Sequence, residues 1–178
     1  ADKAQMKKLA KQTFELDGDT VDQFMDELYS LGKIYTGETE MSAYVDEIYA
    51  AKKAAAADPI QPAAKVALIL PGGGSEHMIA GTDSFYADEI RCATGNPVGP
   101  KGNKFVTLNA ESLIQMNPDV IVVAGNPASF LKDPRFKSLS AIQKKRVLSI
   151  NQDSMLRRGS RVASVIDKLH DNLASVMQ

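Results

Sequence analysis

The sequence is short of the residue types that stabilise small folds through covalent or metal links. Its 178 residues include one cysteine, Cys92, two histidines and no tryptophan. A single cysteine excludes an internal disulfide, and one cysteine with two histidines does not supply a structural zinc site. The length is enough to bury a hydrophobic core of one domain or slightly more, so we expect the fold to depend on that core.

A charge imbalance and long apolar runs are also absent. The chain has 21 basic and 22 acidic residues, a net charge of -1. This balance gives no whole-molecule attraction to nucleic acid or to an anionic membrane. No apolar run approaches the roughly 20 residues that span a bilayer, and no signal peptide opens the sequence. Because it starts at Ala1 and not at a methionine, we expect a processed or trimmed chain.

Apolar periodicity organises the first third of the chain. It predicts helices at 2–11, 20–31 and 40–57 and a strand at 13–16. Gly32 is a suitable residue to end the second helix. Pro59 and Pro62 end the third, and we interpret the segment 58–64 as a linker at a domain boundary.

Strands and helices alternate after this linker. The sequence predicts strands at 65–70, 120–123 and 146–150 and helices at 82–94, 110–116 and 159–176. The β-branched run Val120–Val123 is typical of a strand buried on both faces, as in a parallel sheet. The alternation predicts an α/β fold with a mainly parallel sheet.

Four loops are expected to cluster at the carboxyl edge of this sheet, where open α/β folds bind ligands: 71–81, 99–106, 124–131 and 151–158. Three consecutive glycines, Gly72–Gly74, would let the backbone approach a ligand and offer N–H groups to an anion. The alternative is a flexible turn. No Gly-Lys-Ser/Thr follows, which excludes a P-loop, and His77 stands where a dinucleotide-binding motif needs its third glycine.

Few side chains suit catalysis. A Ser75–His77–Asp83 triad is disfavoured because the Gly-x-Ser-x-Gly elbow is absent. His77 with Met78 could ligate haem iron or another metal, although a lone histidine is more often a surface or hydrogen-bonded residue.

Arginines crowd the entry to the last helix. Arg157, Arg158 and Arg161 suit carboxylate, phosphate or catecholate anions, and the alternative is a solvated basic surface. Lys144–Arg146 is interpreted as a solvated turn.

Several motifs together resemble a known family. They are KVALIL with the glycine loop, AGTDSFYADEI, VTLNAESLIQMNPDVIVV, and FKSLSAIQKKRVLSI followed by RRGSRVASVIDKL. Residues 65–178 resemble the C-terminal lobe of periplasmic substrate-binding proteins of ABC importers, of the ferric-siderophore, haem and cobalamin type. Residues 40–58 resemble the helix that joins the two lobes, and residues 1–39 a remnant of an N-terminal lobe that is mostly missing.

The resemblance implies a three-layer Rossmann-like lobe that captures a ligand without covalent chemistry in a cleft between lobes. It implies an iron chelate as ligand, either a ferric siderophore or haem, and no resident cofactor or metal. The implied partner is the importer's membrane permease, with no nucleic acid and with a homodimer through the incomplete lobe as a further expectation. The implied location is periplasmic, or extracellular and membrane-anchored. The ligand-binding residues expected from it are Gly73, Gly74, Ser75, His77, Met78, Phe85, Asn126, Phe130, Met155, Arg157 and Arg158.

Two alternatives stay open at this point. One is an enzyme on a related α/β scaffold, such as a chelatase, which would need a cluster of acids, bases and metal ligands. The sequence offers only Glu76 and His77 for it. The other is a truncated lobe that acts only as a protein–protein module.

Overall fold

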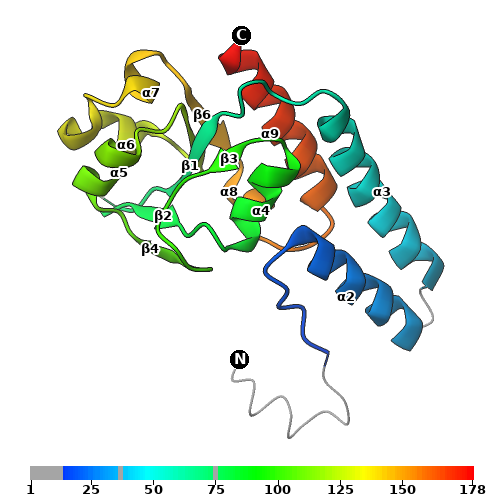
Figure 1. Cartoon of the computed structure of the whole chain (residues 1–178). Coiled ribbons are helices and arrows are strands. Elements are labelled where there is room, and N and C mark those ends of the chain that lie inside the picture. The colour runs from blue at the N-terminus through cyan, green and yellow to red at the C-terminus, as the bar shows by residue number, and fades with distance from the viewer. Residues whose placement is uncertain (1–13, 36–37, 74–75) are drawn as a thin grey trace, which may run out of the picture.

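The computed structural model describes residues 14–35, 38–73 and 76–178. Its helices and strands alternate through the second half of the chain, as Figure 1 shows. Their bounds in chain order are α2 (Val21–Ile34), α3 (Glu38–Ala57), β1 (Lys65–Leu70), β2 (Met78–Ala80), α4 (Phe85–Cys92), β3 (Asn96–Pro97), β4 (Phe105–Thr107), α5 (Ala110–Met116), β5 (Val120–Ala124), α6 (Ala128–Lys132), the 3₁₀ helix η1 (Pro134–Phe136), α7 (Ser140–Gln143), β6 (Val147–Ile150), α8 (Gln152–Met155) and α9 (Val162–Met177).

The strands form one six-stranded sheet. Its order is β4-β2-β1-β5-β6, and β3 pairs with β1 off this path. β1 runs parallel to β3 and β5, and β5 runs parallel to β6. β2 is antiparallel to both β1 and β4. The predicted α/β fold with a mainly parallel sheet is therefore confirmed, with antiparallel pairing confined to one side.

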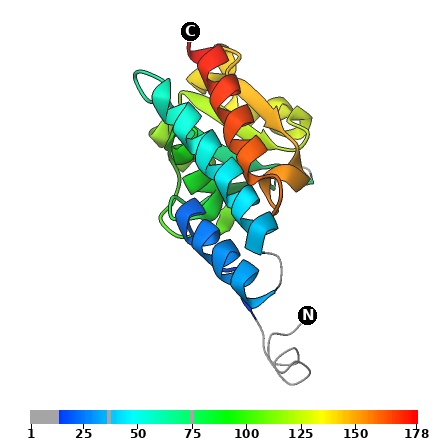
Figure 2. The ribbon, with the colours of Figure 1, turned by 90° about the vertical axis from the view of Figure 1, so that its right-hand side faces the viewer.

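Helices cover both faces of the sheet, which makes a three-layer structure. Successive residues of a strand point to opposite faces, and β5 shows this clearly: Val120 and Val122 belong to one core cluster, Ile121 and Val123 to the other. The first cluster packs against α2, α3, α4 and α9. Figure 2 shows α3 and α9 side by side on that face. The second cluster packs against α5, α6, η1 and α7.

The start of α2 follows from local capping. The Thr20 hydroxyl accepts the N–H of Gln23, and the Gln23 side chain accepts the N–H of Thr20, which is a capping box. The predicted end at Gly32 is wrong, because α2 continues to Ile34. Gly32 is one of the buried residues of α2 and lies inside the helix, so it does not form a C-terminal turn.

Other boundaries also differ from the predictions. The predicted strand at 13–16 is wrong, since residues 14–16 have no regular structure, and the predicted helix at 2–11 lies outside the described residues. The loop predicted at 71–81 contains β2, which pairs with β1 and β4. The helix predicted at 82–94 is shorter because Ser84 caps it: the Ser84 hydroxyl accepts the N–H of Ala87 at 3.2 Å.

The predicted boundary at 58–64 does not separate two cores. Ile48 and Ala51 of α3 belong to the same core cluster as Val66 and Leu68 of β1. The Tyr44 hydroxyl of α3 also donates a hydrogen bond to the Gly159 carbonyl before α9. The division of the chain at this linker stays a prediction.

Glu89 is a buried carboxyl in α4 that is expected to destabilise the fold at neutral pH. Only 1% of Glu89 is exposed, and its Oε2 has no hydrogen-bond partner among the described residues. Burial, with a smaller contribution from Asp88 and a partly opposing one from Arg158, raises the pKa of Glu89 well above its usual value. Because the native pKa is raised, stability is lost as the pH rises above about 4.5, the usual carboxyl value.

The Glu89→Gln variant should therefore be more stable than the parent at pH 7 by about 1–3 kcal/mol. Urea unfolding at pH 7 and pH 4.5 measures this, and the gain should shrink at the lower pH. Glu47→Gln, at an exposed position on α3, is the matched control and should change little. A Glu89→Gln protein less stable than the parent at pH 7 would contradict the expected cost.

Candidate functional site

Three parallel strands end side by side, and the loops that follow them meet. β1 leads to Pro71, β5 to Gly125 and β6 to Asn151. A Cβ atom placed on Gly125 would lie 3.3 Å from Oε1 of Gln152 and 3.8 Å from Cγ of Pro71, so the three loops are in contact. Gly125 also has a φ of +115°, which favours glycine. The predicted convergence at the carboxyl edge is confirmed for three loops, 71–81, 124–131 and 151–158. The loop 99–106 was predicted to join them, and this is wrong: it leads into β4 beside the end of β2, where Gly81 donates its N–H to the Lys104 carbonyl at 3.0 Å.

A cavity of about 400 Å³ lies beside the loop that follows β1. The loop folds tightly, since a Cβ atom on Gly72 would lie 1.7 Å from the carbonyl oxygen of Glu76. Three of the predicted ligand contacts are among the residues that line this cavity, which are Leu70, Pro71, Gly72, Gly73, Glu76, His77, Met78 and Thr107. The predicted contacts Gly74 and Ser75 lie outside the described residues.

His77 lies deeper than the sequence indicated. It is only 1% exposed, and its ring packs against Phe130 and Phe136, with centroid distances of 5.5 and 5.9 Å. Its Nε2 is 3.6 Å from Oδ2 of Asp133, and neither ring nitrogen has a hydrogen-bond partner within the described part of the chain. Arg135 holds the Asp133 carboxylate through its Nε at 3.0 Å and its NH2 group at 2.6 Å. His77 therefore forms part of the wall between the cavity and the second core.

The charges of this cluster follow from its contacts. The Arg135 guanidinium holds the pKa of Asp133 down at about 2. Burial lowers the pKa of His77, although the Asp133 carboxylate opposes that effect. Near pH 7 the imidazole is thus neutral beside an ionised Asp133, and Asp133 and Arg135 neutralise each other.

Phe130, Phe85 and Met155 were predicted as apolar ligand contacts, and the structure places all three in the core. Phe130 belongs to the second cluster and is stacked on Phe136 at 4.7 Å. Phe85 and Met155 belong to the first cluster, each 1% exposed. In this arrangement these side chains pack in the core and support the edge loops.

The two predicted arginines differ in their surroundings. The Arg157 side chain is 76% exposed, and its contact with Asp153 at 3.2 Å is a surface ion pair. The Arg158 side chain is 24% exposed, lies over the Phe85 ring at 4.9 Å, and has an ion pair with Asp19 at 3.7 Å. Arg158 therefore ties the α8–α9 loop to the segment before α2, whereas Arg157 is accessible.

The remaining predicted contacts are accessible at the edge. Gly73 and Asn126 are exposed, and Met78 is half-buried. Oδ1 of Asn126 accepts the N–H of Ala128 at 2.9 Å, and this hydrogen bond fixes the orientation of the Asn126 side-chain amide. Gly73, Met78, Asn126 and Arg157 are thus the predicted residues that a ligand at the edge could reach.

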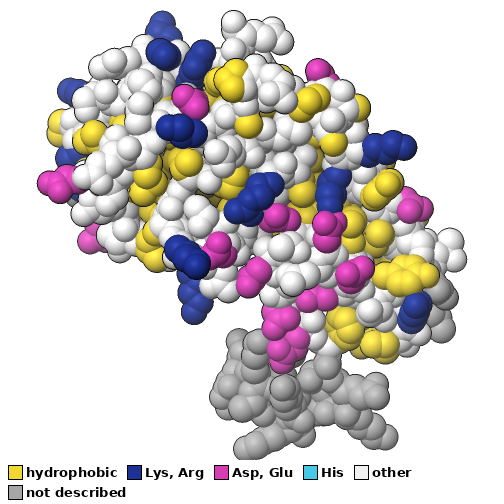
Figure 3. Space-filling view, in the orientation of Figure 1, with side chains coloured by type: hydrophobic (Ala, Val, Ile, Leu, Met, Phe, Trp, Pro, Cys, Tyr) yellow, Lys and Arg dark blue, Asp and Glu magenta, His cyan; other side chains and the backbone are white. Residues whose placement is uncertain are grey.

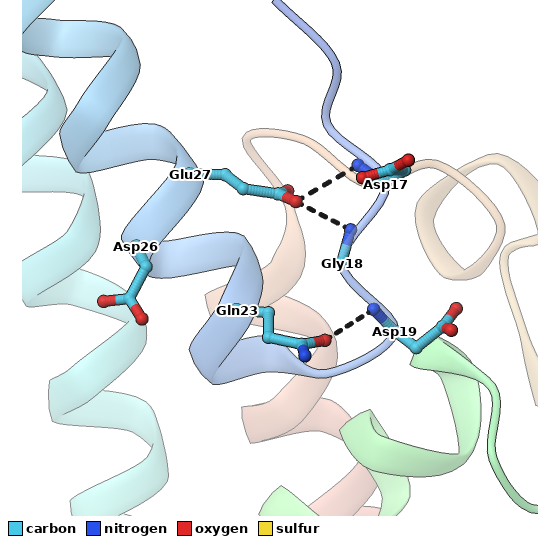
Figure 4. A pocket seen from close by; sticks show the side chains of 6 residues that line it. All are labelled: Asp17, Gly18, Asp19, Gln23, Asp26 and Glu27. Atoms are coloured by element: carbon cyan, nitrogen blue, oxygen red, sulfur yellow. Dashed lines mark hydrogen bonds between the residues drawn. The ribbon is translucent and has the colours of Figure 1, made fainter.

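Sequence reasoning missed a second cavity, of about 470 Å³, before and along the first turns of α2. Figure 4 shows its six lining residues: Asp17, Gly18, Asp19, Gln23, Asp26 and Glu27. Oε1 of Glu27 accepts the N–H groups of Asp17 and Gly18, at 3.3 and 2.8 Å. The Asp17-Gly18-Asp19 turn was its only signal. Within the described ranges, no group of three or more His, Cys, Asp or Glu residues could hold a metal ion.

The described helices were compared with the requirements of a membrane-spanning helix. None of them combines the length and the apolar character that crossing a membrane requires.

Comparisons with known proteins place this geometry in a family. The family model described as periplasmic binding protein matches residues 4–154. A search of curated proteins found no match.

Solved structures share the fold at low sequence identity. The haem-binding protein BhuT, in complex with two haems, is 22% identical with a TM-score of 0.81, over 98% of this chain and 70% of BhuT. IsdE of Staphylococcus aureus, complexed with haem, is 18% identical with a TM-score of 0.78, over 96% of this chain and 71% of IsdE. A structure from Staphylococcus epidermidis, described as a possible iron-binding (periplasmic solute-binding) protein, is 18% identical with a TM-score of 0.78, over 96% and 69% of the two chains. By the extent of the family match, this chain belongs to the periplasmic binding protein family.

Proposed function

We propose that this protein is the solute-binding component of an ABC importer and that its solute is an iron chelate, either a ferric siderophore or haem. The observation that carries the proposal is the meeting of the loops after β1, β5 and β6 beside a cavity of about 400 Å³. In open α/β sheets, ligands bind at this edge. Family membership and the haem- and iron-binding descriptions of structures with this fold support the same reading.

The proposed capture is non-covalent and occurs in a cleft between two lobes. Arg157 would meet anionic groups of the chelate, because its guanidinium is exposed and only weakly held by Asp153. Gly73 would let the ligand approach the backbone, and Met78 and Asn126 would contribute an apolar and a polar contact. Gly74 and Ser75 stay predicted contacts. We assign His77, Phe85, Phe130 and Met155 to the support of the loops.

The proposed partner is the importer's membrane permease, and the proposed location is extracytoplasmic, either periplasmic or at the outer surface of the membrane. Family membership supports both. Self-association through the N-terminal segment stays a prediction.

Binding titrations test the proposal. We expect haem or a ferric siderophore to raise the melting temperature of the protein and to bind at micromolar or lower concentration, and cobalamin is the comparison ligand. If neither haem nor any ferric siderophore of the catecholate, hydroxamate or carboxylate type binds, the iron-chelate proposal fails.

Arg157→Ala should weaken binding of an anionic chelate about tenfold, because it removes a charge-assisted hydrogen bond worth about 1.5 kcal/mol. Isothermal titration calorimetry with the chelate found to bind measures the change. Lys168→Ala removes the same charge from an exposed position on α9 and should leave the affinity unchanged. Equal affinities for the Arg157→Ala and parent proteins would remove Arg157 from the site.

A further inference from the structure

Six cations lie within fifteen residues of the chain and are contributed by α6, by η1 and the residue after it, and by the turn between α7 and β6. We call this set the basic face: Lys132, Arg135, Lys137, Lys144, Lys145 and Arg146. With Asp133, the only carboxylate of the segment, it has a net charge of +5, whereas the whole chain has -1. The rest of the chain is therefore acidic, at -6. Although the total charge is close to zero, positive and negative charges are therefore unevenly distributed over the chain.

Packing directs these cations outward. Phe130, Phe136, Leu139 and Ala141, which alternate with them along the chain, are each no more than 2% exposed and belong to the second core cluster. The cations of the basic face are exposed, except for Arg146, which is half-buried. Lys and Arg side chains gather over α6 and α7 in Figure 3, on the side of the sheet away from α3 and α9.

Most of these charges are not neutralised. Arg135 is the member with a carboxylate partner, Asp133. The nearby carboxylate of Asp119, at the amino end of β5, is engaged elsewhere, because it accepts the N–H of Lys65 at 2.9 Å. Over the described part of the chain, the lysines of the basic face and Arg146 form no ion pair.

Two large aliphatic side chains are exposed on the same side of the sheet. Leu131 of α6, next to Lys132, is 40% exposed, and Ile114 of α5 is 43% exposed. α5 packs against η1, and Asn117 at its end accepts a hydrogen bond from Ser140 of α7 at 3.2 Å. Cations beside isolated aliphatic side chains are what a protein that lies on a bilayer surface presents to it.

The composition of the basic face favours lipid over an acidic protein. Four of its six cations are lysines, which act as hydrated point charges and suit a diffuse anionic surface. Recognition of a protein partner usually depends on aromatic or arginine anchors that fill pockets. Here Arg135, the most firmly held arginine, is already engaged by Asp133 and lies over the Phe136 ring at 5.2 Å.

We propose that the basic face binds the headgroup surface of a bilayer that contains anionic lipid. Leu131 enters the interfacial region while the lysines meet the phosphates. This contact places α6 and α7 against the membrane and leaves the face covered by α3 and α9 turned away from it. The contact uses residues apart from Gly73, Asn126 and Arg157, so it does not depend on the ligand.

Vesicle cosedimentation tests the proposal with the whole protein. The vesicles are phosphatidylcholine with roughly one third phosphatidylglycerol, or phosphatidylcholine alone, at low and high salt. We expect binding to the anionic vesicles at low salt, weakening at high salt, and none to phosphatidylcholine alone. Each cation near an anionic surface contributes up to about fivefold to the affinity. The variant K132Q/K137Q/K144Q/K145Q should therefore bind at least about tenfold more weakly.

The matched control is K53Q/K101Q/K104Q/K168Q, which removes the same charge from exposed positions outside the basic face. It should keep at least half of the parent affinity. Equal losses in the two variants would show that net charge alone is responsible and would overturn the proposal. Binding of the parent to phosphatidylcholine alone, or no binding to either vesicle, would also overturn it.

The Leu131→Ser variant separates lipid from an acidic protein. It should weaken vesicle binding about threefold or more and leave binding to soluble polyglutamate unchanged, because only a bilayer offers an apolar layer to this side chain. If polyglutamate binds the parent protein and anionic vesicles do not, the basic face is a docking site for acidic protein and the lipid proposal is wrong. Titration of the K132Q/K137Q/K144Q/K145Q variant with the iron chelate should give the affinity of the parent, because the basic face lies apart from the ligand site.

Discussion

Replacing Phe130 by alanine should lower the free energy of unfolding by about 3–5 kcal/mol, the largest effect expected of a single substitution here. Phe130 is completely buried, stacked on Phe136 and in edge contact with His77. Its removal would leave a cavity between the sheet and the α6–α7 side. Because α6 starts where the loop after β5 ends, the edge loops should loosen together with the core.

Chemical unfolding measures this effect, and Leu131→Ala is the matched control. Leu131 is the next residue of the same helix and is 40% exposed, so its truncation should cost less than about 1 kcal/mol. A Phe130→Ala protein within 1 kcal/mol of the parent would mean that the side chain is not packed as described. In that case Phe130 would be free to contact a ligand, as the sequence first indicated.

The sequence was sufficient to predict the architecture of the lobe. The runs KVALIL and VIVV indicate strands buried on both faces, and they form the central pair β1 and β5 within one residue of the predicted bounds. The loops after these strands follow from the topology, because parallel strands end at one edge. These features depend on local composition and on the alternation of elements, which a single sequence contains.

The features that sequence reasoning missed depend on contacts between distant segments. β2 has only three residues, and it is a strand because β1 and β4 pair with it on both sides. His77 was interpreted as a loop residue, but Phe130, Asp133 and Phe136 enclose it, more than fifty positions along the chain. No local pattern predicts such an enclosure.

Contacts between distant segments also decide which of the predicted site residues are accessible and which are buried or paired. Residue type suggested Arg157 and Arg158 equally, yet Asp19, from the other end of the chain, engages only Arg158. Likewise, the family resemblance implied Phe85 and Phe130 as ligand contacts, and both lie in core clusters. The sequence therefore indicated which loops form the site, while the packing of distant segments decides which side chains a ligand can reach.

Burial of His77 should make the stability of the protein fall as the pH drops below about 6.5. Burial lowers the pKa of His77 from its usual value of 6.5, so the unfolded chain binds a proton at a pH where the native protein does not. Stability is then greatest above pH 6.5 and is lost as the pH falls below it, by at most about 1.4 kcal/mol per pH unit until the native imidazole is also protonated. Between pH 6.5 and pH 5 we therefore expect this residue to lower the stability of the protein as the pH falls.

Other groups must be separated from this effect. The raised pKa of Glu89 works in the opposite direction over the same range, because the native state keeps a proton that the unfolded chain loses. The pKa of Asp133, at about 2, places its titration below this range. The profile of the parent protein alone therefore does not isolate His77.

The difference between variants does isolate it. Urea unfolding at several pH values between 5 and 7.5 should show a shallower loss of stability on acidification for His77→Gln than for the parent. His77→Phe should behave in the same way if glutamine is poorly accommodated, since both remove the titrating ring nitrogens. His170→Gln removes the chain's other histidine, which lies half-buried near Thr94 and Ala93, and should keep the steeper profile of the parent. If His77→Gln and His170→Gln gave the same profile as the parent, His77 would not be the residue whose burial makes acid destabilise the fold.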